Sequence, residues 1–145
     1  MTADSHNLNR FISAQSNIYS QVITELKNGH KKSHWMWFVF PQIDGLGHSE
    51  IAKEYAITNE EEAIAYLNHP TLGKRLIECS EILLTIKNCS ASDIFGYPDD
   101  LKLKSSMTLF ASVINTHPVF SQIIDQYFAG KKDAKTLSIM TTLKK

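Results

Sequence analysis

The sequence predicts an all-α fold, and three observations lead to that prediction. Apolar residues recur three and four positions apart along most of the chain, which is the spacing of one helix face. No segment shows the sustained alternation of apolar and polar residues that marks a strand. The four prolines stand between the periodic segments, where a helix can begin but cannot continue. With 145 residues, 43% of them hydrophobic, we expect a single domain over residues 1–145, built of seven or eight short-to-medium helices around an ordered core from about 7 to 143.

The first helix is predicted from a run of apolar residues on one face between residues 8 and 26. Gly29 then supplies a left-handed stop. The next segment, residues 34–40, is apolar nearly all round, so we expect it deep in the core, either helical or extended. Pro41 ends that segment.

A loop is predicted over residues 43–48, and Ser49 is placed to cap a short helix that runs through Tyr55. Thr58 and Glu61 form a capping-box pattern for the following helix. Glu61 also lies within an acidic run, and negative charge stabilises a helix N-terminus.

Five more helices are predicted after residue 70. Their boundaries come from prolines and capping residues before each helix and from glycines after two of them. The predicted helices are a long one over 72–86, a short one that Ser90 and Asp93 cap, one after Pro98, one from Pro118 to Gly130, and one from Asp133 through Leu143 with Leu137 and Met140 facing inward.

Charge and hydropathy exclude several classes of function. Fifteen Lys and Arg residues balance fifteen Asp and Glu residues, which argues against a general nucleic-acid-binding role because such a role needs a large basic surface. The longest apolar run, residues 35–40, is far shorter than the roughly 20 residues of a membrane span. The two cysteines, Cys79 and Cys89, do not form a disulfide framework, and we interpret both as small buried side chains of a reduced, cytoplasmic protein.

One stretch is chemically unusual. Residues 29–49 contain three of the six histidines, both tryptophans and two adjacent lysines. Burial energy accounts for the aromatic residues, but it does not account for the cations and imidazoles placed just before them. We interpret the stretch as an anion-binding site in which lysine charge, imidazole donors and close backbone approach at two glycines act together. The candidate residues there are Lys31, Lys32, Ser33, His34, Trp35, Gln42, Gly45, Gly47, His48 and Ser49.

A second polar cluster follows Asp99 and Asp100, and Lys104, Ser105 and Ser106 are its candidate residues. One interpretation is a solvated helix face. The other is that these residues join the same pocket as His34, where a serine beside a lysine could act as nucleophile and base.

The histidines of this stretch also suggest a metal site as an alternative. His30, His34, His48 and Asp44 are the residues that would supply the ligands. However, Gly29 ends the preceding helix, and no glutamate stands where a hydrolytic metal helix needs one. We therefore predict no metal and no cofactor.

Several strings of residues resemble an uncharacterised bacterial family, domain of unknown function 1810. They are residues 32–42, 45–49, 69–76, 95–100 and 102–110, and the resemblance extends over roughly residues 8–137. The resemblance implies an all-helical fold and carries no established activity. Family members often have arginine where this chain has Lys104, which replaces a two-pronged donor by a point charge. Some members are labelled calpastatin, a protease inhibitor, but inhibitors of that kind act as disordered segments whereas this composition predicts a packed protein.

Three functions follow as hypotheses. The first is a pocket that binds a small anionic or nucleotide-like ligand, with or without hydrolytic or transfer chemistry. The second is a protein-interaction module or homodimer that uses exposed aromatic residues, for which Tyr19, Tyr55, Tyr66 and Trp35 are the candidates. The third, and the weakest because the net charge is zero, is an RNA or single-strand binder that stacks bases on the tryptophans.

Overall fold

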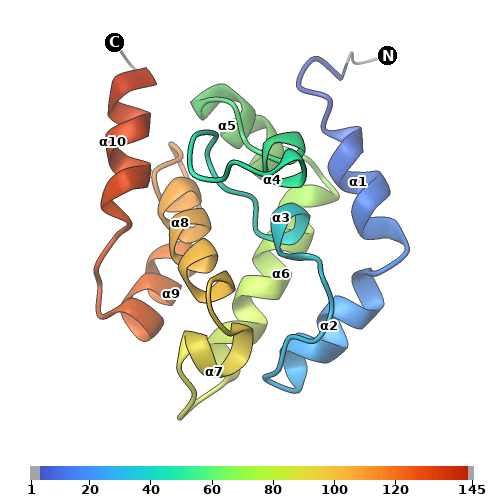
Figure 1. Ribbon diagram of the computed structural model, residues 1–145, viewed down its shortest axis with the longest axis vertical. Helices are drawn as coiled ribbons and strands as arrows, with labels where there is room; N and C mark the ends of the chain where they lie inside the picture. Colours follow the sequence, from blue (N-terminus) through green and yellow to red (C-terminus); the bar gives the residue numbers. More distant parts are fainter. Residues whose placement is uncertain (1–3, 144–145) are drawn as a thin grey trace.

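The computed structural model describes residues 4–143, and these residues form helices and no β-strand (Figure 1). The predicted all-α class is confirmed. The ten helices found there are α1 (Asn9–Ser16), α2 (Tyr19–Lys27), α3 (Met36–Val39), α4 (Glu50–Glu54), α5 (Glu60–Asn68), α6 (Leu72–Thr85), α7 (Ala91–Phe95), α8 (Asp99–Ala111), α9 (Val119–Phe128) and α10 (Ala134–Leu143).

The helix count exceeds the predicted seven or eight for two reasons. The segment predicted as one helix from residue 8 to 26 is divided into α1 and α2, because the apolar spacing lapses after Ile12. Gln15 takes the buried position there, and its side-chain amide donates to the Phe38 carbonyl at 2.7 Å and to the Tyr66 hydroxyl at 3.1 Å. The apolar segment 34–40 is neither wholly helical nor extended, since it holds the single-turn helix α3.

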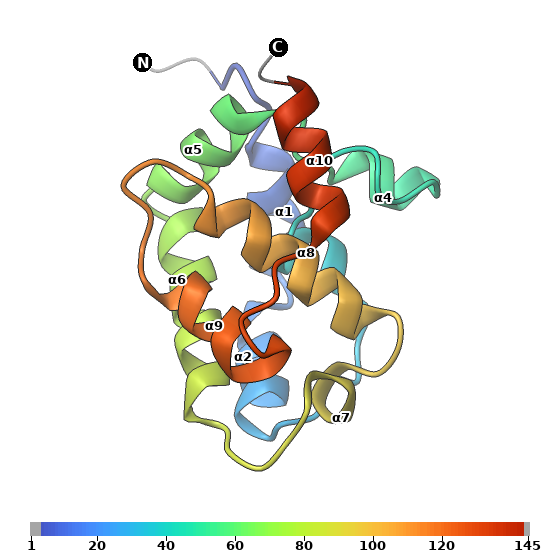
Figure 2. The same cartoon turned by 90° about the vertical axis from the view of Figure 1, so that its left-hand side faces the viewer.

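Helix α8 occupies the centre of the molecule, with α10 and α9 packed against it on the face shown in Figure 2. Helices α5 and α7 also contact it. From Leu103 to Phe110 nearly every side chain of α8 is buried. A helix covered on all sides is normally apolar all round, yet α8 also carries Ser105, Ser106 and Thr108 into the interior.

Several predicted helix caps are present. Ser49 accepts a hydrogen bond from the Ala52 N–H, and Asp133 accepts one from the Thr136 N–H. Ser90 and Asp93 form a complete capping box.

The predicted cap of α5 is wrong by one residue. Asn59 rather than Thr58 is the N-cap, and its side-chain oxygen accepts from the Glu62 N–H at 2.9 Å. The reciprocal glutamate is therefore Glu62 and not Glu61, and it accepts from the Thr58 N–H at 2.9 Å. Asparagine is at least as good an N-cap as threonine, which explains the shift.

Three predictions of burial have different outcomes. Cys79 is buried as expected, and burial raises the pKa of its thiol to about 12. Cys89 is exposed, so its predicted burial is wrong. In α10, Met140 faces inward as predicted, whereas Leu137 is 37% exposed and Thr136 occupies the buried position instead.

The segment around α4 projects from the rest of the molecule (Figure 2). Its two ends are joined by an isolated parallel bridge between Ile43 and Ile57. In this bridge the Asp44 N–H donates to the Ile57 carbonyl, and the Ile57 N–H donates to the Gln42 carbonyl, both at 2.8 Å. The bridge fixes the base of the loop that carries Gly45, Gly47 and His48.

None of the helices in the described part of the chain has the length and apolarity needed to cross a membrane.

Candidate functional site

A buried carboxylate organises the segment that precedes α3. Glu25 of α2 accepts five hydrogen bonds, from the backbone N–H groups of Lys32 and Ser33, the Ser33 hydroxyl, the Trp35 indole N–H and the Gln21 amide, at 2.7 to 3.0 Å. The Ser33 hydroxyl and the indole N–H of Trp35 therefore both donate to Glu25. The Lys32 side chain is exposed, and only its backbone takes part.

These hydrogen bonds decide the charge state of Glu25. Burial alone would raise the pKa of the carboxyl, but donation from Lys32, Ser33 and Gln21 outweighs burial and lowers the pKa from 4.5 to about 2. Glu25 is thus an anion at any ordinary pH, and the segment around it is held by charge-assisted hydrogen bonds.

Two lysines and two tryptophans meet around Asp99 at the start of α8. Lys31 Nζ lies 2.8 Å from Asp99 Oδ2, and Lys102 Nζ lies 3.4 Å from Asp99 Oδ1. The same ammonium groups lie over indole rings, Lys31 at 5.1 Å from the Trp35 ring centroid and Lys102 at 4.8 Å from that of Trp37. Two cations against one carboxylate leave this cluster with one positive charge. The structure thus brings the two stretches singled out in the sequence together, through Lys102 rather than Lys104.

Trp37 also forms a wall of a small hollow at the base of the projecting loop. The hollow has about 10 Å³ of free space, roughly that of one water molecule. We refer to it as the Trp37 hollow. Its lining residues are Trp37, Gln42, Ile43, Gly45, Gly47, Ala52, Tyr55 and Ala56. Three predicted site residues, Gln42, Gly45 and Gly47, therefore lie together beside an aromatic wall.

The two glycines of the loop are required by the fold. Gly45 has φ +108°, a conformation that L side chains rarely adopt. A Cβ on Gly47 would lie 2.6 Å from the Ala52 Cβ, so this glycine lets the loop approach α4. Backbone geometry alone therefore accounts for both residues.

The backbone of this loop nevertheless has unused donors. Among residues 4–143, the N–H groups of residues 45–49 find no hydrogen-bond acceptor. They occupy consecutive positions beside the Trp37 hollow. Consecutive backbone N–H groups of this kind are the donors that anion sites in proteins use.

The two histidines predicted for the site do not converge on it. His34 and His48 are exposed, and neither forms a hydrogen bond or ion pair within the described residues. Neither of them lines the Trp37 hollow. His48 lies on the loop itself, next to Ser49, whereas His34 lies before Trp35 on the segment that Glu25 holds.

Lys104, Ser105 and Ser106 are not in the hollow either. The Ser105 hydroxyl donates to the Leu101 carbonyl at 3.1 Å, one turn back along α8. Ser106 is fully buried, and its hydroxyl has no partner. Lys104 is half-buried. The core position of α8 explains why neither serine reaches a ligand outside.

The aromatic residues predicted for a partner surface are mostly inside. Trp35 and Tyr66 are fully buried, and Tyr55 is half-buried against Phe11 and Phe38. Tyr19 is half-buried with its hydroxyl bound to the Glu78 carboxylate. None of these four rings is an exposed stacking or docking surface.

Within residues 4–143, no three His, Cys, Asp or Glu side chains are close enough together to hold a metal ion.

Three acidic residues with structural roles were missed in the sequence: Glu25, Glu62 and Asp99. Glu25 and Glu62 are both buried, and both lie on the core-facing side of their helices. An acidic residue among the apolar positions of a helix face was the available signal, since a carboxylate there must find donors. The sequence around Asp99 indicates only a helix start, and nothing local indicates its contact with Lys31.

These features define an all-helical protein with a cation–aromatic cluster beside a projecting glycine loop. The chain belongs to the family described as protein of unknown function DUF1810, whose family model matches residues 5–140. Its structure is similar to the crystal structure of the conserved hypothetical protein Rv1873 from Mycobacterium tuberculosis, with a TM-score of 0.94 and 46% sequence identity over 95% of this chain and 99% of that one. The comparison with curated proteins found no match. Neither description states an activity, so any function is argued from the site.

Proposed function

We propose that this protein binds a small anionic ligand on the loop formed by residues 45–49, beside Trp37. One observation carries the proposal: five consecutive backbone N–H groups lack an acceptor within residues 4–143, next to a hollow that Trp37, Gln42 and Tyr55 line. The amides supply the donors for a phosphate or carboxylate group.

The surroundings of the loop support this choice of ligand class. Lys102 lies over the Trp37 ring, and the cluster it forms with Lys31 and Asp99 has one positive charge in excess. An anion near this cluster gains favourable Coulomb energy. Because the hollow holds only about 10 Å³, the ligand lies on the loop and over the indole rather than within a closed cavity. A ligand with a planar part, such as a nucleotide, uses the ring as well as the amides.

Binding is proposed without a reaction. The serines considered as nucleophiles, Ser105 and Ser106, are buried in α8 and do not line the hollow. The exposed histidines, His34 and His48, have no orienting partner among the described residues. A general base is normally held in place by such a partner.

The test is calorimetric titration of the protein with pyrophosphate, AMP and citrate. At least one probe is expected to bind. Lys102→Gln is expected to lower the affinity for that probe about fivefold, which corresponds to a loss of roughly 1 kcal/mol. Trp37→Leu is expected to lower the affinity for AMP more than the affinity for pyrophosphate, since only AMP has a planar base. The control, Lys132→Gln, changes an exposed lysine that does not line the hollow and is expected to bind as the wild type does. Absence of binding by all three probes, or an equal loss in the control, would contradict the proposal.

Self-association is a second candidate function, favoured by one observation. Tyr97, just before α8, is 80% exposed, and Leu101, in the first turn of α8, is 49% exposed, so two large side chains close in sequence face solvent. Exposed apolar side chains that lie together are typical of protein-binding surfaces. Sedimentation equilibrium of the wild type and of Tyr97→Ser with Leu101→Ser tests this candidate: a dimer that the double substitution dissociates supports it, and a monomer at all concentrations contradicts it.

A further inference from the structure

Two side chains of the Trp37 hollow carry hydrogen-bonding groups that the fold does not use. The Gln42 side-chain amide and the Trp37 indole N–H have no hydrogen-bond partner within residues 4–143. Both side chains are half-buried. In this part of the chain only the Ser106 hydroxyl is a fully buried side-chain group without a partner, so the groups of Gln42 and Trp37 reach solvent. Both are therefore available to a ligand on the loop.

The backbone of Gln42 is held in a fixed position beside Trp37. Its carbonyl accepts from the Ile57 N–H at 2.8 Å, in the bridge at the base of the projecting loop. The next residue, Ile43, is 1% exposed, and Ile57 is fully buried. The side chain of Gln42 thus starts from an anchored point, and a hydrogen-bonding group that is anchored loses less freedom when a ligand binds.

The side-chain amide of Gln42 presents a donor and an acceptor side by side. Its Nε2 donates and its Oε1 accepts, so it suits a ligand with a donor next to an acceptor. The bases of nucleotides have such edges, and their planar rings stack on aromatic side chains. Trp37 supplies an aromatic ring next to Gln42 in the same hollow. The two side chains together therefore suit a nucleotide base.

Adenine matches these two side chains better than the other common bases do. Its amino group donates beside the acceptor N7 on one edge and beside the acceptor N1 on the other, so either edge can pair with a glutamine amide. Guanine has a donor next to an acceptor on one edge only, because its N7 and O6 both accept. A purine also covers more of an indole ring than a pyrimidine does.

We infer that the anionic ligand of the loop is an adenine nucleotide. Its phosphate binds the N–H groups of residues 45–49, and its base lies on Trp37 with the amino group paired to Gln42. This inference rests on the proposed function, since it places the phosphate on the same loop. Lys102 lies over the Trp37 ring, so the base uses the part of the indole that Lys102 leaves open. With about 10 Å³ of space, the hollow holds the base at its mouth and not inside.

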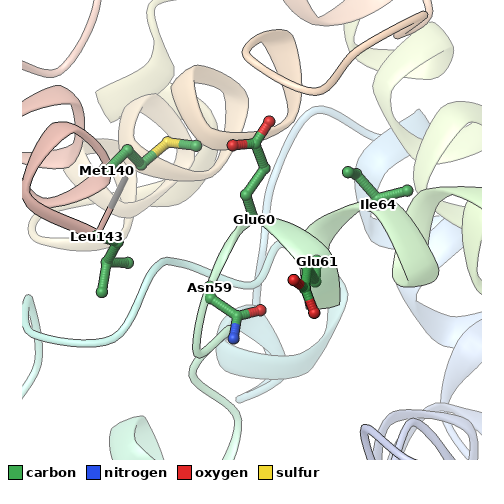
Figure 3. Close-up of a pocket in the computed structure, with 6 residues that line it drawn as sticks. All are labelled: Asn59, Glu60, Glu61, Ile64, Met140 and Leu143. Atoms are coloured by element: carbon green, nitrogen blue, oxygen red, sulfur yellow. The ribbon is translucent and has the colours of Figure 1, made fainter. Parts of the chain in front are cut away.

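A larger groove between α5 and α10 is less suitable for such a ligand. Figure 3 shows Met140 and Leu143 on the α10 side of this groove and Ile64 on the α5 side. The groove has a volume of about 280 Å³, but no lysine, arginine or histidine lines it, so it supplies no cation to a phosphate. It shares no residue with the Trp37 hollow. Its lining residues are Asn59, Glu60, Glu61, Ile64, Met140 and Leu143.

The test is calorimetric titration with AMP and with purine riboside 5′-monophosphate, which lacks only the amino group of adenine. The wild type is expected to bind AMP about fivefold more tightly, because one hydrogen bond to Gln42 depends on that group. Gln42→Leu is expected to bind the two nucleotides equally and to bind pyrophosphate as the wild type does. AMP is also expected to bind the wild type more tightly than GMP and CMP do.

A second variant tests the same contact by changing its hydrogen-bonding pattern. Gln42→Glu leaves two acceptors and no donor, and the N1–H and amino group of guanine can donate to both. The affinity for GMP relative to that for AMP is expected to rise about threefold in this variant. Because the two nucleotides have the same charge, repulsion by the new carboxylate affects both. The control is Gln122→Leu, which removes an exposed amide of α9 outside the hollow and is expected to bind every probe as the wild type does.

Three outcomes overturn the inference: equal wild-type affinity for AMP and purine riboside 5′-monophosphate, a difference between them that Gln42→Leu leaves unchanged, or wild-type binding of GMP or CMP as tight as that of AMP. If pyrophosphate binds and one of these outcomes is found, the anion site stands and only the adenine assignment fails. If pyrophosphate and all the nucleotides fail to bind, the proposed function fails and this inference fails with it.

Discussion

Glu25 shows how one buried side chain determines the path of a whole loop. Its Oε1 atom alone accepts from the backbone N–H groups of Lys32 and Ser33 and from the indole N–H of Trp35, which come seven to ten residues later. A carboxylate with this many donors is stable as an anion inside the protein. Removal of its charge leaves several donors poorly satisfied, and this gives the first prediction.

Glu25→Gln is expected to destabilise the protein by about 2 to 3 kcal/mol at pH 7, because charge-assisted hydrogen bonds are lost. The folded-state pKa of about 2 lies below the ordinary value of 4.5, so the contribution of Glu25 is complete above pH 4.5. It is lost as the pH falls from 4.5 through about 2. Urea unfolding at pH 7, 4 and 3 measures both proteins. The difference in unfolding free energy between wild type and variant should become smaller as the pH falls. A difference that stays constant or grows would contradict this account.

The residue scale is also where the sequence was least informative. The sequence predicts Lys32 and Ser33 as ligand residues, because no local pattern indicates that Glu25 binds their backbone. The sequence also predicts Ser105 and Ser106 as pocket residues, whereas both are buried in α8. Such errors arise because partners distant in sequence decide which polar groups remain free.

At the scale of elements, the start and end signals were more reliable. The capping box of Ser90 and Asp93 and the cap of Ser49 were predicted from residue type alone, since these contacts lie within four residues. The division between α1 and α2 was missed because no glycine or proline marks it. Close helix–helix contact was also invisible in the sequence, and Gly73 is the clearest case.

Gly73→Ala is expected to destabilise the protein by about 3 kcal/mol, at the upper end for an overpacked site. A Cβ there would lie 1.9 Å from the Leu67 carbonyl oxygen, so α6 would have to move away from the end of α5. Gly96→Ala is the comparison, because its Cβ meets no atom and only φ +74° opposes it; about 1 kcal/mol is expected there. Thermal or chemical unfolding gives both values. A loss for Gly73→Ala no larger than that for Gly96→Ala would show that the contact is not tight.

At the scale of the molecule, Arg10 joins parts of the chain that are far apart in sequence. Its guanidinium binds Glu62 and donates to four backbone carbonyls, those of His6, Asn7, Glu54 and Ala56. Its five N–H groups are thereby used. Arg10 thus connects the N-terminal segment, the end of α4 and the start of α5, and it is structural rather than a free ligand for anions.

Arg10→Met is expected to cost about 3 to 5 kcal/mol of stability, because it leaves the Glu62 carboxylate buried without its cation. Adding Glu62→Gln should recover part of this loss, since the charge left unpaired is then removed. Urea unfolding of the two single variants and the double variant measures the coupling. If the loss in the double variant equals the sum of the two single losses, Arg10 acts through packing and not through Glu62.

The overall architecture followed from the sequence because apolar spacing and helix boundaries are local signals. Only part of the candidate site could be predicted from the sequence. Gln42, Gly45 and Gly47 do line one hollow with Trp37, and the stretches around Lys31 and Lys102 do meet. The histidines do not converge with them, because whether an exposed side chain turns toward a site depends on backbone geometry that residue type does not reveal.

The most direct measurement of the central claim is the amide NMR spectrum of the loop during a titration with pyrophosphate. If this loop is the anion site, the N–H signals of residues 45–49 and the indole N–H of Trp37 shift together and saturate, while the indole N–H of Trp35, which Glu25 already holds, changes little. Signals from the loop that stay in place while others respond, or a spectrum that pyrophosphate leaves unchanged, would contradict the account.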